Sequence, residues 1–204
     1  ALKLLADTEE LSAACSLDPL ADLGWGQPVI PEASVLGLVG PAQGHLRNRC
    51  EDGLERLFGP GSPDHGDHER ARERLEHELG IIGDLNLAGY FLTVATATDL
   101  IRDLGVRSAA RGSGASSLVA YLIGISHVNP IQHDLVFERF LSRERTSLPD
   151  IDVDVESARR HEVYRALFDR FGEQRTTLMS MQNAYRARGA VRDAGLALGM
   201  EPEQ

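Results

Sequence analysis

Three aspartates alternate with β-branched residues in the segment Pro149-Asp150-Ile151-Asp152-Val153-Asp154-Val155. Side chains alternate between the two faces of a strand, so the aspartates are predicted to share one face and the apolar residues to fill the core on the other. Carboxylates about 7 Å apart repel one another, and a hard cation with oxygen ligands such as Mg²⁺ relieves that repulsion. An exposed acidic sheet face is the alternative, but aspartate is a poor strand former. The segment therefore predicts a metal site.

A turn of small residues, Arg111-Gly112-Ser113-Gly114-Ala115-Ser116-Ser117, follows a short apolar strand and leads into the apolar segment 118–125. Such a turn at a helix N-terminus leaves backbone N–H groups free at the positive end of the helix dipole, which suits a phosphate. Ser113 can add a hydroxyl and Arg111 a charged fork. Glycine and serine also form ordinary turns and helix caps, and this segment alone leaves that alternative open.

A third segment, Tyr185-Arg186-Ala187-Arg188-Gly189-Ala190-Val191-Arg192-Asp193, carries another carboxylate. If it is helical, one face carries Arg186, Gly189 or Ala190, and Asp193. Asp193 could then complete a cluster of three carboxylates, although an ordinary surface helix has the same pattern. A phosphate-binding turn combined with metal-binding carboxylates is what two-metal phosphoryl transfer to a hydroxyl requires.

The rest of the chain supplies the elements that must position these segments. Residues 17–43 contain four prolines and several glycines and are predicted to form a linker. Hydrophobic periodicity and breakers predict the following elements: helices at 1–16, at Arg47–Phe58 before Gly59-Pro60-Gly61, at His68–Leu79 and at Thr98–Leu104; a β-prone segment at Tyr90–Thr96; and a strand at Val106–Ala109.

The composition narrows the class of protein. The 204 residues carry a formal charge of −10, and residues 1–138 hold all of it, with 10 basic and 20 acidic side chains. This balance argues against nonspecific nucleic-acid binding by the first part of the chain. No apolar stretch approaches the length of a membrane span, which predicts no membrane partner. Cys15 and Cys50 have no metal-ligand spacing, so we expect two buried or inert thiols and a cytoplasmic protein.

Taken in order, ARGSGASSLVAYLIGI, FERFLSRERTSLPDIDVDVE and YRARGAVRDAG resemble the palm domain of bacterial C-family DNA polymerases, the polymerase III alpha-subunit family. The resemblance runs from about Leu75 to Met200 and includes GYFL at Gly89–Leu92. The last motif looks more like the error-prone branch than the main replicative branch. In the replicative branch a lysine-containing segment stands here, and Arg188 occupies that position.

The resemblance implies an α+β fold, a partial β-like nucleotidyltransferase palm preceded by a helical, Pro/Gly-rich lead-in. Residues 1–60 would be the tail of a PHP domain with a linker, and residues 61–204 the N-terminal part of the palm. It also implies a role for individual residues, with Ala110 replacing the family's usual glycine. Asp152, Asp154 and Asp193 would be catalytic metal ligands, Asp150 would support them, Gly112 and Ser113 would hold the triphosphate, and Arg111, Arg145 and Arg188 would contact phosphates.

The implied activity is DNA-directed DNA synthesis of the error-prone, translesion type, with two Mg²⁺ ions, for which Mn²⁺ can substitute. The implied partners are a DNA primer-template and dNTPs, with a sliding clamp and damage-tolerance proteins in the parent protein. Fingers, thumb and most of the PHP domain have no counterpart here, so we expect a fragment with little activity alone. Two alternatives stay open: a noncatalytic palm-like module in a damage-tolerance assembly, and a stand-alone nucleotidyltransferase.

Overall fold

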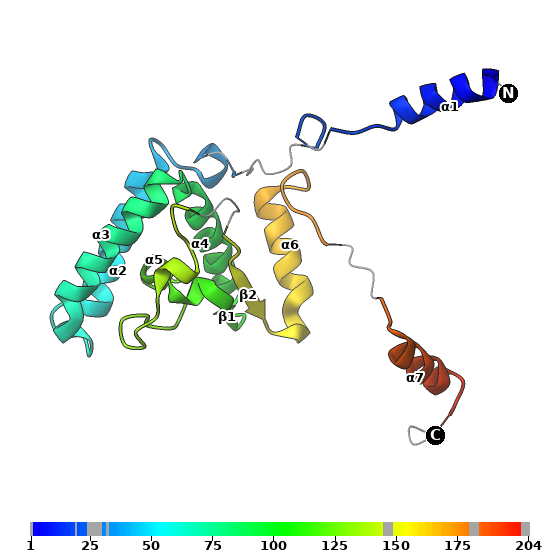
Figure 1. Cartoon of the computed structure of the whole chain (residues 1–204). Helices are drawn as coiled ribbons and strands as arrows, with labels where there is room; N and C mark the ends of the chain where they lie inside the picture. Colours follow the sequence, from blue (N-terminus) through cyan, green and yellow to red (C-terminus); the bar gives the residue numbers. More distant parts are fainter. Residues whose placement is uncertain are drawn as a thin grey trace.

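The computed structural model describes residues 2–18, 20–23, 30–31, 33–144, 149–179 and 184–200 (Figure 1). Helices dominate these residues, together with one sheet of two strands. The mixed, helix-rich architecture confirms the predicted α+β class. The helices are α1 (Leu2–Ala14), α2 (Ala42–Phe58), α3 (His68–Asp84), α4 (Ala88–Asp103), α5 (Leu118–Leu122), α6 (Arg160–Phe171) and α7 (Ala187–Ala197), and the strands are β1 (Ser108–Arg111) and β2 (Asp152–Val155).

Helices α2 to α5 enclose the main hydrophobic core. Along α2 the buried residues Leu46, Cys50, Leu54 and Phe58 recur every fourth position and form one apolar face. Gly53 lies where α2 meets α5, and a Cβ at this position would come within 2.3 Å of the carbonyl oxygen of Leu122. The close approach of these two helices therefore depends on glycine at position 53.

Helix α4 corrects the prediction of a β-prone segment at 90–96. The segment is helical, and its buried residues, such as Phe91, Leu92 and Ala95, follow the spacing of one helix face. The hydroxyls of Thr93 and Thr96 donate to carbonyl oxygens four residues earlier, each at 2.8 Å, so the threonines are accommodated within the helix. Tertiary burial of this face outweighs the strand preference of β-branched residues.

The other helices lie where predicted, but their ends differ. Helix α2 begins at Ala42, directly after Pro41, rather than at position 47. Helix α3 continues beyond the predicted end to Asp84, because Ile81 and Ile82 extend its buried face into the core. The predicted helices at the start of the chain and after position 186 are present as α1 and α7.

The two strands pair antiparallel, with Arg111 opposite Asp152 and Ala109 opposite Asp154. The apolar residues of the acidic segment are partly buried, as predicted: Ile151 packs against the main core. Val153 and Val155 pack against a second, smaller cluster formed by residues of α4 and α6 and by Val106. The alternation in sequence therefore gives the strand one apolar face and one acidic face.

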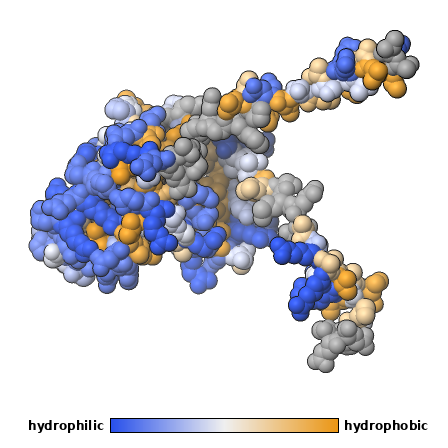
Figure 2. All heavy atoms as spheres, viewed as in Figure 1, coloured by the Kyte–Doolittle hydropathy of each residue, from blue (hydrophilic) through white to orange (hydrophobic). Residues whose placement is uncertain are grey.

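Helices α1 and α7 lie apart from the rest of the described chain (Figure 1). Helix α7 has no buried residue. Figure 2 shows a mostly hydrophilic face over α2 and α3, whereas apolar side chains are visible on the segments around α1 and α7. The exposed apolar side chains of these two segments include Leu4, Leu5 and Leu11 near one end and Val191, Leu196, Leu198 and Met200 near the other.

The two cysteines differ in environment. Cys50 is fully buried in α2, as expected, whereas Cys15 is exposed. Of the two expectations, burial or inertness, burial therefore holds for Cys50 and not for Cys15, which follows the end of α1. Among the described residues no single helix is long and apolar enough to cross a membrane. The segments His65–Asp84 and Ala88–Asp103, which meet at a sharp bend, reach the required length and apolar composition only when they are taken together.

Candidate functional site

The acidic face of the sheet carries one arginine among its aspartates. The Nε of Arg111 lies 3.1 Å from the nearer carboxylate oxygen of Asp154, and its Nη2 lies 3.8 Å from Asp152 Oδ2. All three side chains are partly exposed. A single positive charge therefore faces both carboxylates. Arg111, predicted to contact phosphate, instead forms ion pairs with the acidic row in this structure.

Asp150 precedes β2 and is exposed. Among the described residues it forms no hydrogen bond or ion pair. The charge of Asp150 acts on Tyr90, whose hydroxyl accepts a hydrogen bond from the Ile151 amide at 3.2 Å. Burial raises the pKa of Tyr90, the Ile151 hydrogen bond opposes this, and the negative charges of Asp150 and Asp152 raise it further. Both carboxylates therefore lie within electrostatic range of one phenol.

The glycine-serine turn forms a 3₁₀ turn, Gly112–Ser116, directly after β1. Gly112 has φ +73°, a conformation that glycine adopts without strain. A Cβ on Gly112 would lie 3.4 Å from Asp152 Oδ2, and one on Gly114 would contact the Ile151 side chain at 3.6 Å. The turn thus lies beside Ile151 and Asp152, at the end of β2 nearer to Asp150 than to Asp154.

A hollow of about 410 Å³ adjoins this turn. Gly112 and Ser113 form part of one wall, and Leu135, Val136 and Arg139 form another. Arg139 is exposed, and no hydrogen bond or ion pair ties it to another described residue. The hollow has room for a polyphosphate beside the predicted turn.

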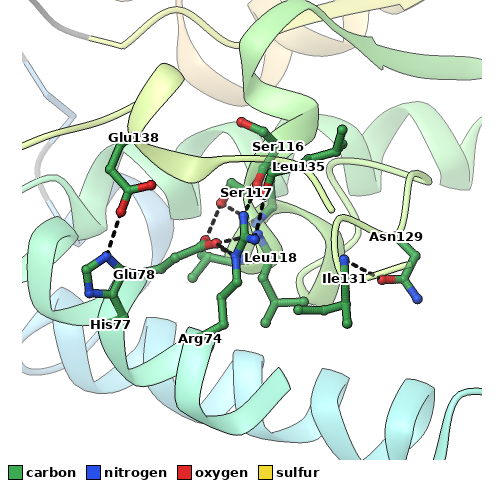
Figure 3. Close-up of polar contacts among 12 residues, drawn as sticks. Arg74, His77, Glu78, Ser116, Ser117, Leu118, Asn129, Ile131, Leu135 and Glu138 are labelled. Atoms are coloured by element: carbon green, nitrogen blue, oxygen red, sulfur yellow. Dashed lines mark hydrogen bonds and ion pairs between the residues drawn. The ribbon is translucent and has the colours of Figure 1, made fainter. Parts of the chain in front are cut away.

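The N-terminus of α5 is already occupied by a protein carboxylate. The backbone amides of Leu118 and Val119 donate to Glu78 at 2.9 and 3.0 Å, and the Ala120 amide donates to the Ser117 hydroxyl at 3.1 Å (Figure 3). The expectation that the N–H groups at this helix N-terminus are free was therefore wrong, because these donors already have internal acceptors.

Glu78 lies on α3, and its fully buried carboxylate accepts four hydrogen bonds. Besides the two amides, it accepts hydrogen bonds from Ser117 Oγ at 2.8 Å and from Arg74 Nε at 2.9 Å. Burial raises the pKa of Glu78, and the bonds from Leu118, Arg74 and Val119 act in the opposite direction. The buried carboxylate is thus compensated by a partner charge and by directed donors, as buried charges require.

Sequence reasoning missed Glu78 and Arg74. The available signal was periodicity, because Glu78 lies three residues after Leu75 and seven after Ala71, on the apolar face of α3. A glutamate at such a position is rarely buried without a partner. Arg74, one helical turn earlier, is that partner.

The third predicted carboxylate lies elsewhere. Asp193 is on α7, apart from both strands in Figure 1, and forms an ion pair with Arg192 at 2.8 Å. Arg188 is exposed on the same helix. Within the described part of the chain, no group of three or more histidine, cysteine or acidic side chains could hold a metal ion. Arg145 lies outside the described residues.

Comparison with known proteins adds the decisive observation. Residues 44–204 match the model of the bacterial DNA polymerase III alpha NTPase domain. The chain belongs to this family. The match includes the glycine-serine turn, the acidic strand and α7, and it confirms the resemblance found in the sequence.

Individual relatives point to the error-prone branch. An error-prone DNA polymerase of Dechloromonas aromatica (strain RCB) is 39% identical over 199 residues, which cover 97% of this chain and 18% of that protein. One of Bradyrhizobium sp. (strain ORS 278) is 43% identical over 185 residues, 91% of this chain and 15% of the relative. The error-prone DNA polymerase 2 of Rhizobium meliloti (strain 1021) is 38% identical over 196 residues, which cover 96% of this chain and 17% of that protein. The chain thus spans less than a fifth of the length of these relatives.

Proposed function

We propose that this chain is the part of an error-prone DNA-directed DNA polymerase that holds the triphosphate of a dNTP and the catalytic cations. The observation that carries the proposal is the position of Asp152, with an aspartate two residues away on either side, against the glycine-serine turn and its hollow of about 410 Å³. DNA primer-template and dNTPs are the proposed substrates, and the bacterial cytoplasm is the proposed location. A sliding clamp and damage-tolerance proteins are proposed partners of the whole protein.

The acidic face fits a divalent cation by its donor chemistry. Carboxylate oxygens are the ligands that Mg²⁺ and Mn²⁺ take, and a cation already neutralises this face in the form of the Arg111 guanidinium. When bound, the ions would supply activation of a primer 3′-hydroxyl and neutralisation of the triphosphate charge. This chemistry requires carboxylates next to the phosphate-binding turn.

Asp152 is the proposed central ligand, because its Oδ2 lies closest to Gly112 among the contacts of the turn. Either Asp150 or Asp154, each two residues from Asp152 in the sequence, can supply the second carboxylate. Asp154 was the prediction from sequence, but it is paired with Arg111, whereas Asp150 forms no hydrogen bond or ion pair with another described residue and shares the environment of Tyr90 with Asp152. We therefore favour Asp150 with Asp152. The proposal does not rest on Asp193, which lies apart from the sheet.

The protein's own groups bind and orient the nucleotide. Gly112 and Ser113 line the hollow, where their backbone amides and the Ser113 hydroxyl would donate hydrogen bonds to a triphosphate. Arg111 becomes available to a phosphate once a cation replaces it at the carboxylates. Arg145 and Arg188 remain predicted phosphate contacts.

Calorimetric titration of this chain with a dNTP, in Mg²⁺ and in EDTA, tests the proposal. We expect binding that requires the metal and that Asp152→Asn weakens at least about tenfold, because a divalent charge loses a negative partner at contact distance. A site that binds no dNTP in either condition would favour a noncatalytic module. Nucleotide transfer without a template would favour the stand-alone nucleotidyltransferase.

A further inference from the structure

The ion pair between Arg74 and Glu78 contacts the glycine-serine turn but does not line the hollow beside it. Arg74 reaches three different acceptors with its guanidinium: Nε bonds Glu78, Nη2 donates to the Ser116 carbonyl at 2.7 Å and Nη1 donates to the Leu135 carbonyl at 2.6 Å (Figure 3). Ser116 and Leu135, from two segments far apart in the sequence, both line the hollow of about 410 Å³. The Arg74 side chain therefore joins the two segments that line the hollow.

Glu78 binds the residues that follow the glycine-serine turn. Its carboxylate accepts from the amides of Leu118 and Val119 and from the hydroxyl of Ser117, the three residues that directly follow the turn. The end of the turn is thus bound through Ser116 to Arg74 and through Ser117 to Glu78. Both side chains come from α3, which packs in the main core.

We propose that Arg74 and Glu78 are positioning residues that fix the glycine-serine turn and the width of the adjoining hollow for a triphosphate. This inference rests on the proposed function of the turn. Neither residue lines the hollow, so both act through the backbone of residues 116, 118, 119 and 135 and through the Ser117 hydroxyl. A planar guanidinium can bond three acceptors in fixed directions, and a lysine ammonium cannot reproduce that fork.

Arg74→Lys is the first test, because it keeps a positive charge beside Glu78 but removes the fork. We expect it to weaken binding of dATP with Mn²⁺, and of inorganic tripolyphosphate, about tenfold, the effect of losing a hydrogen bond to a charged group. Hydrogen exchange of the amides of residues 113–119 should also become faster. Both are measured at a temperature where circular dichroism shows the variant folded.

Arg70→Lys is the matched control. Arg70 lies one turn earlier on α3 and pairs with Asp134 on the surface, where both side chains are mostly exposed. The same chemical change there should leave binding and exchange of the turn unchanged. If Arg74→Lys does not fold, Ser117→Ala carries the test, since it removes a donor to Glu78 and a cap of α5 and should likewise weaken binding of both probes and speed exchange of the turn.

The results separate a positioning role from a purely structural one. If Arg74→Lys lowers the melting temperature but binds both probes as the unmodified chain does, the proposal is overturned. If the unmodified chain binds neither probe, the proposed function of this chain fails, and hydrogen exchange decides the positioning role separately. Unchanged exchange at residues 113–119 would then overturn it, and faster exchange confined to them would support it.

Discussion

The guanidinium of Arg111 lies against the carboxylate of Asp154, with Nε 3.1 Å from Oδ2. The antiparallel register causes this contact, since Arg111 is opposite Asp152 and diagonal to Asp154 on the same face of the sheet. The repulsion expected within the aspartate row is therefore relieved by the protein itself. A metal ion must compete with this arginine for the carboxylates.

Arg111→Gln is expected to raise the affinity for Mn²⁺ about fivefold, because a competing unit charge near 4 Å is worth about 1 kcal/mol in water. Calorimetry measures this directly. In EDTA the same variant should lose less than about 1 kcal/mol of unfolding free energy, as is usual for an exposed ion pair. Arg107→Gln is the control, because Arg107 pairs with Glu156 at 3.0 Å outside the aspartate row. Weaker Mn²⁺ binding in Arg111→Gln would mean that the arginine supports the metal site.

The two candidates for the second metal ligand can be told apart by Asp150→Asn and Asp154→Asn. We expect Asp150→Asn to weaken Mn²⁺ binding at least about tenfold and Asp154→Asn to change it less than about threefold, since Arg111 already neutralises Asp154. Titration of both variants under identical conditions is the measurement. The reverse order of effects would restore Asp152 and Asp154 as the pair.

Gly112→Ala and Gly114→Ala form a matched pair within the turn. The positive φ of Gly112 makes alanine cost about 1 kcal/mol or more there, and its new methyl would approach Asp152. Gly114 has no such backbone constraint, and its methyl would make only ordinary contacts with Ile151. Urea unfolding should show the larger loss of stability for Gly112→Ala. Equal losses would mean that packing around the turn, rather than backbone conformation, limits both positions.

The cysteines should differ in reactivity. Burial raises the pKa of Cys50 far above the usual thiol range, whereas Cys15 is exposed. At pH 8 iodoacetamide should therefore modify Cys15 and leave Cys50 intact, because the thiolate is the reactive form. Mass spectrometry of the folded chain reads this out, and the same reaction in denaturant should label both. Rapid labelling of Cys50 in the folded chain would show that the core around α2 opens readily.

Local patterns were sufficient for several elements. The alternation of aspartates with Ile151, Val153 and Val155 predicted a strand with one acidic and one apolar face, and the structure has that strand. The Gly59-Pro60 breaker correctly predicted where α2 ends. Such features depend on neighbours within a few positions of the sequence. The segment at 90–96 shows the limit, because its threonines favour a strand locally while burial in the main core, with α2 as a neighbour, favours a helix.

The sequence by itself determined the family, the acidic strand and the glycine-serine turn, because each is a contiguous motif of residue types. Tertiary structure alone decided the partners of these motifs. Arg111 neutralises Asp154 only through strand register, and Glu78 occupies the helix N-terminus predicted for phosphate from 39 positions away. Asp193, placed with the other carboxylates by sequence reasoning, lies on a helix apart from them. Contacts between distant segments follow from packing and register, which no local pattern encodes.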